Sequence, residues 1–198
     1  MLKRGMLVVV SGPSGVGKDT VIGEYLKSSD SCVLSVSATT RAIRMGEEHG
    51  KDYYYLERKN FMKKAQNGHM LEWAEYNGNF YGTPRDVVER ERDAGRNVIL
   101  IIEVQGAMNV RKLCHEAVLV FIAPPSMGIL RERLTKRASD DADTIERRLD
   151  IAHREMKKAK LYDYILINQD YRICAADFGT VIRAASFSPK HTGLLTQL

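Results

Sequence analysis

The sequence predicts an α/β fold, in which a parallel β-sheet is covered by α-helices. Apolar, β-branched runs alternate with amphipathic helical patterns along most of the chain, and this alternation is typical of parallel strands joined by helices. The chain has 198 residues, of which 44% are hydrophobic, enough for one domain with a substantial core. The expected strands, each with the helix that follows it, are residues 7–10 and 18–27, 98–102 and 105–113, 118–122 and 127–137, and 164–167 and 171–185.

A further helix is marked by its end residues. Thr83 and Pro84 supply an N-cap and a proline for the first helical position, and Asp86 supplies an acidic first turn. Gly95 supplies a stop signal. This helix is therefore expected between Thr83 and Gly95.

Two segments interrupt the alternation. Between Ser35 and Tyr81 the pattern is mixed, with strand-like residues 52–56 and 70–76 around a short helix near residues 61–66. A small β-rich lobe at about residues 35–83, inserted into the core, is the simplest account of this segment.

The second interruption is the polar run of residues 138–144, between two arginine-bearing helices, the second of which is expected at about residues 144–160. A polar hinge between helices predicts a lid at about residues 126–150. The core then comprises residues 1–34, 84–125 and 151–187, and residues 188–198 are expected to form a loose tail.

Composition excludes several classes of protein. No apolar run approaches the roughly 20 residues that cross a bilayer, so no membrane span is expected, and the apolar run at residues 6–10 leads into a glycine loop, as a first strand does and an export signal does not. The 3 cysteines and 5 histidines form no disulfide or zinc pattern, which favours a reducing cytoplasm. A net charge of +5 favours anionic partners, but charge alone does not choose among nucleic acid, membrane and nucleotide.

The segment GPSGVGK at residues 12–18 has the pattern of a phosphate-binding P-loop, and it lies between a strand and a helix as that loop requires. Glycines let backbone N–H groups surround phosphate oxygens, the helix directs its positive end inward, and the lysine adds a full charge. The sequence thus predicts a P-loop NTPase-type fold. The expected phosphate-contacting residues are Gly12, Pro13, Ser14, Gly15, Val16, Gly17 and Lys18.

One position departs from the P-loop pattern. The residue after the lysine is ordinarily Ser or Thr, which binds magnesium, whereas this chain has Asp19 followed by Thr20. A carboxylate binds magnesium or a water in its shell, but it also adds negative charge beside the phosphates. Whether Asp19 or Thr20 is a direct metal ligand stays open at this point.

Together with the P-loop, six further motifs resemble the guanylate kinase family, in order and at its usual spacing, from about Met6 to Asn168. They are SVSATTR (35–41), GKDY (50–53), EWA (72–74), YGT (81–83), QG (105–106) and FIAPP (121–125). The resemblance implies an ATP:GMP phosphotransferase that makes GDP and ADP with the help of Mg²⁺, in which the inserted lobe binds GMP and the helical lid closes over ATP.

The resemblance places the GMP phosphate on Arg41 and Arg44, with phenolic hydrogen bonds from Tyr53 and Tyr81. Arginine suits this task because its guanidinium forks onto phosphate oxygens. No general base is expected, since the acceptor phosphate is already largely ionised and phosphoryl transfer needs alignment and charge neutralisation.

Glu72 is the residue expected to select guanine. A carboxylate accepts from the ring N–H and the exocyclic amino group of guanine at once, whereas adenine presents an acceptor at the equivalent ring nitrogen. By the resemblance, Ser37 and Thr83 complete the guanine contacts, and Glu103 lies near the acceptor, where it either binds magnesium-bound water or orients an arginine. A second acidic position of the family is Ile101 here.

On the ATP side the resemblance places Arg133, Arg137 and Arg148 in the lid and Asn168 near the adenine. Arg137 and Arg148, with Lys18 and Arg41, are the expected catalytic residues, because they would stabilise charge on the transferring group.

Three alternatives remain at this stage. One is a nucleoside monophosphate kinase with another acceptor, against which Glu72, Ser37 and Thr83 argue. Another is the non-catalytic guanylate-kinase-like domain of scaffold proteins, which typically has a degraded phosphate loop, whereas Lys18 and the loop are present here. The third is nucleic-acid binding, which would need an exposed basic stripe. ATP and GMP are the expected partners, without nucleic acid or membrane, and the sequence leaves the oligomeric state open.

Overall fold

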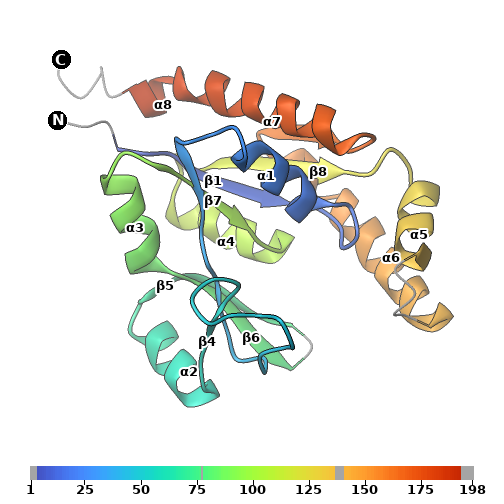
Figure 1. Ribbon diagram of the computed structural model, residues 1–198, viewed down its shortest axis with the longest axis horizontal. Helices are drawn as coiled ribbons and strands as arrows, with labels where there is room; N and C mark the ends of the chain where they lie inside the picture. The colour runs from blue at the N-terminus through green and yellow to red at the C-terminus, as the bar shows by residue number, and fades with distance from the viewer. Residues whose placement is uncertain (1–3, 77, 137–140, 193–198) are drawn as a thin grey trace.

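A five-stranded parallel sheet forms the centre of the protein, in the computed structural model that describes residues 4–76, 78–136 and 141–192. Its strand order is β2-β7-β1-β8-β9, and every neighbouring pair is parallel (Figure 1). The strands are β1 (Leu7–Ser11), β2 (Cys32–Leu34), β7 (Asn97–Ile101), β8 (Val118–Ala123) and β9 (Tyr164–Ile167). The α/β fold with a parallel sheet is thereby confirmed.

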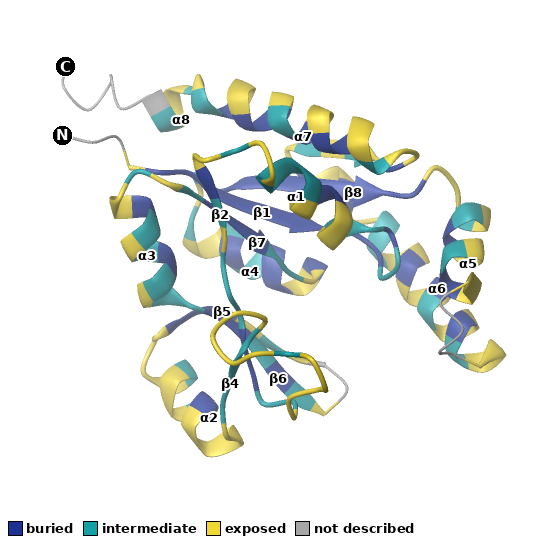
Figure 2. Cartoon of the chain, viewed as in Figure 1, coloured by how far each residue is buried: buried dark blue, intermediate teal, exposed yellow. Residues whose placement is uncertain are grey.

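Helices cover both faces of this sheet, as its unbroken apolar strands require. On one face α1 (Lys18–Leu26) and α7 (Tyr171–Ser186) pack on Val8 and Val10 of β1. On the other face α3 (Arg85–Asp93) and α4 (Val104–Leu113) pack on its Leu7 and Val9. Because successive strand residues point to opposite faces, β1 has no exposed residue and holds the two cores together (Figure 2).

A second sheet lies below the central sheet in the view of Figure 1 and has a small hydrophobic core of its own. Its strand order is β4-β3-β6-β5, and β5 and β6 form an antiparallel hairpin. Its elements are β3 (Ala38–Thr39), β4 (Tyr54–Tyr55), α2 (Arg58–Gln66), β5 (Met70–Tyr76) and β6 (Asn79–Pro84). Ala38, Phe61, Met70 and Phe80 pack together between α2 and the strands.

A pair of helices, α5 (Met127–Lys136) and α6 (Ala142–Met156), also has a separate apolar cluster. Leu130 and Leu134 of α5 face Ile145, Leu149 and Ala152 of α6. A 3₁₀ turn, η1 (Ala159–Leu161), leads back to β9, and α8 (Pro189–Thr192) follows α7. No helix within the described ranges combines the length and the apolar character that a membrane span needs.

The structure corrects three local predictions. Thr83 is not the N-cap of α3, because Pro84 occupies that position and the Thr83 hydroxyl donates to Glu72 instead. The helix expected at residues 144–160 begins earlier, at Ala142, since the Asp141 side chain accepts from the Thr144 N–H, and it ends at Met156. Residues 189–192, which were expected in a loose tail, form the short helix α8.

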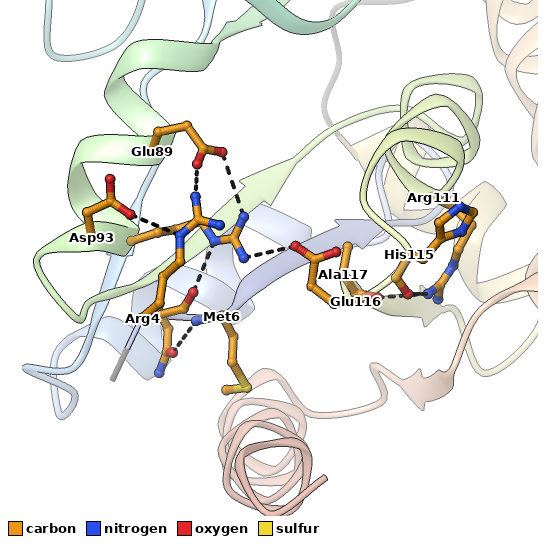
Figure 3. Close-up of polar contacts among 11 residues, drawn as sticks. Arg4, Met6, Glu89, Asp93, Arg111, His115, Glu116 and Ala117 are labelled. Atoms are coloured by element: carbon orange, nitrogen blue, oxygen red, sulfur yellow. Dashed lines mark hydrogen bonds and ion pairs between the residues drawn. The ribbon is translucent and has the colours of Figure 1, made fainter. Parts of the chain in front are cut away.

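A buried arginine joins the first strand to α3. The Arg92 side chain is only 5% exposed, and it donates through Nε to the Gly5 carbonyl at 3.0 Å and through an Nη to Glu116 at 3.1 Å. Arg4 also pairs with Glu89 and Asp93 of the same helix (Figure 3). This network ties the entry of β1 to α3.

Replacing Arg92 by leucine should lower the free energy of unfolding by about 1–3 kcal/mol, because the Gly5 carbonyl loses its charged donor in a buried place. Chemical denaturation of Arg92→Leu measures the loss. The matched control is Arg90→Leu on the same helix, whose side chain is 69% exposed and which should cost less than about 0.5 kcal/mol. Equal losses in the two variants would contradict the structural role of Arg92.

Candidate active site

Three adjoining pockets lie along the edge at which the parallel strands end. The phosphate loop follows β1, Glu103 follows β7 and Asn168 follows β9, and ligands of open α/β sheets bind at this carboxyl edge. The pockets are a lobe pocket of about 260 Å³ around Glu72 and Tyr81, a loop pocket of about 340 Å³ around Lys18 and Asp19, and an outer pocket of about 250 Å³ around Arg133 and Asn168.

The pockets share walls and therefore form one continuous site. Ser37, Tyr53 and Glu103 line both the lobe pocket and the loop pocket. Gly15, Gly17 and Thr20 line both the loop pocket and the outer pocket. A ligand in the lobe pocket and another in the outer pocket would thus meet in the loop pocket, beside Lys18.

The phosphate loop is wound as tightly as its sequence predicts. A side chain at Gly12 would place its Cβ 2.1 Å from the Ile122 carbonyl oxygen, so only glycine fits between β1 and β8. Gly17 has φ 94° at the start of α1, a conformation that favours glycine. The Lys18 ammonium donates to the carbonyls of Gly12 at 2.6 Å and Pro13 at 3.2 Å, which holds the cation at the mouth of the loop.

Glu72 provides a buried carboxylate in the lobe pocket. Its side chain comes from β5, is 7% exposed, and accepts from the Thr83 hydroxyl at 2.8 Å. Burial raises the pKa of Glu72, and the Thr83 hydrogen bond partly opposes that shift. Gly106 of α4 makes room for the second oxygen, since a Cβ there would lie 2.6 Å from Glu72 Oε2. The carboxylate is therefore half satisfied and suited to a ligand with paired N–H donors.

Arg41 lies beside the same pocket and is held by a carboxylate that sequence analysis missed. Its two terminal nitrogens donate to Glu47 at 2.8 and 3.0 Å, and the guanidinium carbon lies 5.5 Å from the centre of the Tyr53 ring. Burial raises the pKa of Tyr53, and nearby Tyr81 and Asp19 raise it further, so Tyr53 is a protonated hydroxyl donor at neutral pH. The position of Glu47 shortly after Arg41 and Arg44, in RAIRMGE (residues 41–47), was the available signal.

Three residues expected at the acceptor site, Arg41, Arg44 and Thr83, line neither the lobe pocket nor the loop pocket. The Arg44 side chain is exposed and lines neither the lobe pocket nor the loop pocket, because its backbone N–H and carbonyl close a turn onto Glu47. Thr83 lies behind Glu72 and contacts that side chain. The Thr83 hydroxyl therefore orients the carboxylate in this structure.

Asn168 and Arg133 meet at the outer pocket. The Asn168 amide donates to the Val16 carbonyl at 2.8 Å, while its Oδ1 is buried and has no partner among the described residues. Arg133 donates to the carbonyls of Val16 and Asn168 at 3.2 and 2.8 Å. The outer pocket is thus built on the phosphate loop and presents an unused amide oxygen. Gln169, Asp170 and Tyr171 also line it, and sequence analysis did not name them.

The remaining arginines belong to the helix pair. Arg148 lies on α6 and is partly buried, and Arg137 lies outside the described residues. Arg131 pairs with Glu146 across α5 and α6, so this arginine joins the two helices.

Glu155 was not predicted and lies close to the catalytic edge. It comes from the last turn of α6, and burial together with the neighbouring Glu103 raises its pKa to about 7, while Lys18 opposes the shift. The helix pair therefore ends in a carboxylate beside Glu103 and near Lys18. Nothing in the local sequence distinguishes Glu155 from other helical glutamates, so only the fold reveals it.

Side-chain oxygens line the loop pocket without forming a ready-made metal site in the described part of the chain. Asp19 and Thr20 both line the loop pocket, and both are exposed. Within residues 4–76, 78–136 and 141–192 there is no group of three or more His, Cys, Asp or Glu side chains that could hold a metal. Ile101 lines two of the pockets with an apolar side chain. A metal ion here would need additional ligands from a bound molecule.

Known proteins share both this sequence and this fold. A family model described as guanylate kinase matches residues 4–185. The guanylate kinase of Carboxydothermus hydrogenoformans is 43% identical over 189 residues, 96% of this chain and 93% of that protein. That of Streptococcus thermophilus is 45% identical over 188 residues, 94% of this chain and 90% of that protein.

The crystal structure of guanylate kinase from Anaplasma phagocytophilum agrees in three dimensions. It superposes with a TM-score of 0.80 at 37% identity, and the match covers 99% of this chain and 94% of that one. The resemblance that the sequence motifs indicated is thus confirmed over nearly the whole chain. On sequence and on fold, this chain belongs to the guanylate kinase family.

Proposed function

We propose that this guanylate kinase transfers the terminal phosphoryl group of ATP to GMP, and so makes ADP and GDP, with GMP in the lobe pocket and ATP across the phosphate loop and the outer pocket. The observation that carries the proposal is the buried Glu72 carboxylate, which faces a pocket that opens onto the phosphate loop. A buried carboxylate is costly unless a ligand pairs with it.

Guanine supplies the pairing that Glu72 lacks. The ring N–H and the exocyclic amino group of guanine would donate to its carboxylate, whose Oε1 already accepts from Thr83. Adenine would leave the carboxylate facing an acceptor, and such mismatches can cost a factor of about 10⁴–10⁵. Ser37, which lines the same pocket, adds a hydroxyl for the guanine, and Glu103 borders the ribose and phosphate side.

The phosphate of GMP would then lie between Arg41, Tyr53 and Tyr81, at the opening to the loop pocket. Arg44 would join it by a rotation of its exposed side chain. Lys18 and the backbone of residues 12–18 would hold the ATP phosphates on the other side. With both nucleotides held, the reaction needs chiefly in-line alignment and neutralisation of charge, to which Lys18 and Arg41 contribute from opposite sides.

The outer pocket and the helix pair would complete the binding site for ATP. The unused Oδ1 of Asn168 is an acceptor for the amino group of adenine. Arg133 holds the phosphate loop by donating to the Val16 carbonyl. We assign Arg137 and Arg148 to the transferring phosphoryl group, as a lid at residues 126–150 closes. The separate apolar clusters of the helix pair and of the lobe at residues 35–83 support motion of these parts relative to the core.

The loop pocket fits a magnesium ion that arrives with ATP. Magnesium is commonly held by one or two protein oxygens together with substrate phosphates, and the Asp19 carboxylate and Thr20 hydroxyl are the groups available beside Lys18. When bound, the ion would neutralise charge on the phosphates. The three free cysteines support a reducing, cytoplasmic location, and the partners proposed are the small-molecule nucleotides.

The substrate proposal is tested by measuring ADP release with ATP and magnesium, while GMP, AMP, CMP and UMP are supplied separately at equal concentration. Turnover should occur with GMP and be at least about 1,000-fold slower with AMP, because the buried Glu72 carboxylate rejects an acceptor. Preference for any other nucleotide would overturn the substrate and leave the family intact.

Glu72→Gln should abolish the GMP preference and leave the unliganded protein at least as stable. The amide places an N–H donor against the donors of guanine, so kcat/KM for GMP should fall at least about 100-fold. The pKa of Glu72 is raised in the folded state. Its stabilising contribution is therefore lost as pH rises through that pKa, and an uncharged amide should not lower Tm at pH 7.5.

The matched control is Glu75→Gln on the same strand, whose side chain is 52% exposed. It should change neither the preference nor Tm appreciably. Unchanged GMP selectivity in Glu72→Gln would sink the proposed role of the carboxylate, whatever the stability shows.

Glu155 should make stability depend on pH in the weakly acidic range. Its pKa is about 7 in the folded protein against an ordinary value of 4.5. The folded state therefore keeps a proton that the unfolded chain releases, and the free energy of unfolding should fall as pH rises from about 5 to 7. Denaturation of wild type and Glu155→Gln across this range measures the effect. The variant should lose part of the slope, and parallel curves would contradict this assignment.

A further inference from the structure

Glu47 is the most fully bonded side chain near the proposed phosphate site, although it does not line a pocket. Its Oε1 accepts from an Arg41 terminal nitrogen at 2.8 Å. Its Oε2 accepts from the other Arg41 terminal nitrogen at 3.0 Å, from the Arg44 backbone N–H at 2.9 Å and from the Tyr55 hydroxyl at 2.7 Å. A carboxylate has about four acceptor sites, so Glu47 has none left for a ligand.

The donors of Arg41 show what this arrangement leaves available. One terminal nitrogen, Nη1, donates to Glu47 and to the Ala42 carbonyl at 2.8 Å, and Nη2 donates once, to Glu47. An arginine has five N–H donors. The bonds to Glu47 and Ala42 engage three of these and leave Nε–H and one hydrogen on Nη2, and the Tyr81 side chain is a polar neighbour of the same guanidinium. These two hydrogens lie side by side on one edge of the planar group, where they form a fork that matches two phosphate oxygens.

Neighbouring rings hold that guanidinium in place. Its carbon lies 5.5 Å from the centre of the Tyr53 ring and 5.8 Å from that of Tyr55, and the Arg41 side chain is only 13% exposed. Tyr53 lines both the lobe pocket and the loop pocket. The unused edge of Arg41 is thus kept next to the passage between the two pockets.

We infer that Glu47 is a positioning residue for the acceptor phosphate: it occupies the end of the Arg41 guanidinium and so presents the Nε–H edge to GMP. The inference rests on the proposed function, because it takes GMP as the ligand of the lobe pocket. Glu47 acts through Arg41 and itself touches no substrate.

Charge repulsion alone and the positioning role predict opposite effects of removing Glu47 on GMP binding. A carboxylate close to an anionic phosphate repels it, so removal of the Glu47 charge would strengthen GMP binding if charge alone mattered. If Glu47 instead orients the fork, its removal lets Arg41 rotate and weakens GMP binding. The pKa of Glu47 is held at about 2, chiefly by the Arg41 hydrogen bonds, so the carboxylate is ionised throughout the working pH range.

The experiment compares Glu47→Gln with Glu48→Gln under steady-state conditions, together with binding of guanosine, which lacks the phosphate. Glu48 is the matched control because it lies in the same loop, carries the same charge and is 71% exposed, with Lys51 as an ion-pair partner at 3.6 Å. In Glu47→Gln the KM for GMP should rise roughly 10- to 100-fold, the ratio that corresponds to one charge-assisted hydrogen bond. The KM for ATP, the guanosine Kd and all values for Glu48→Gln should stay within about twofold, since none of them depends on the Arg41 fork.

A double-mutant cycle separates positioning from a general effect on the loop. In the Arg41→Lys background the fork is absent, so adding Glu47→Gln should raise the KM for GMP less than about threefold further. An equally large effect with and without Arg41, or a lower KM for GMP in Glu47→Gln, would overturn the inference. Thermal unfolding of each variant checks that the loop still folds. Failure of the proposed function would appear separately, as absence of GMP turnover in the wild-type protein.

Discussion

The tight turn between β1 and α1 is the constraint on which the rest of the structure depends. At Gly12 the backbone passes so close to the Ile122 carbonyl that no side chain fits, and such a turn keeps its shape only if the strands on either side do not move. Burial of β1 on both faces provides that rigidity. Because all neighbouring strands run parallel to β1, the residues that follow them collect at the same edge. The catalytic site is thus a consequence of how the sheet holds the loop.

Two carboxyl groups near the pockets, Glu72 and Glu155, are buried or partly buried at a cost in free energy. Glu72 would be more stable as a neutral group, and its raised pKa shows that burial opposes its charge. Guanine is the kind of ligand that offsets this penalty, because it brings two donors to the two oxygens. At the end of α6, burial and the neighbouring Glu103 likewise oppose the charge of Glu155, which lies near Lys18. Marginal stability is therefore concentrated where ligands bind, as is common for enzymes.

The lobe at residues 35–83 and the helix pair α5 and α6 are packed separately from the central sheet. Each has a small apolar cluster of its own, Phe61 and Phe80 in the lobe and Leu130 and Leu149 in the helix pair. The helix pair contacts the core through Arg133, which donates to the Val16 carbonyl of the phosphate loop. Parts built in this way can shift without opening the central core. Within the lobe, Glu47 and the rings of Tyr53 and Tyr55 fix the position of the Arg41 guanidinium without a bound phosphate.

The sequence by itself determined the fold class, the strands and helices of the core and the phosphate loop, because period-2 and period-3.6 patterns and glycine spacing are local properties. It also identified Glu72 and Arg41, through motifs that resemble a family. Only the tertiary structure decided that Thr83 bonds to Glu72 instead of capping α3, that the Arg44 side chain is exposed, that Glu47 pairs with Arg41, and that Glu155 lies beside Glu103. Those roles depend on contacts between residues distant in the chain or on side-chain direction, and neither leaves a periodic signal in the sequence.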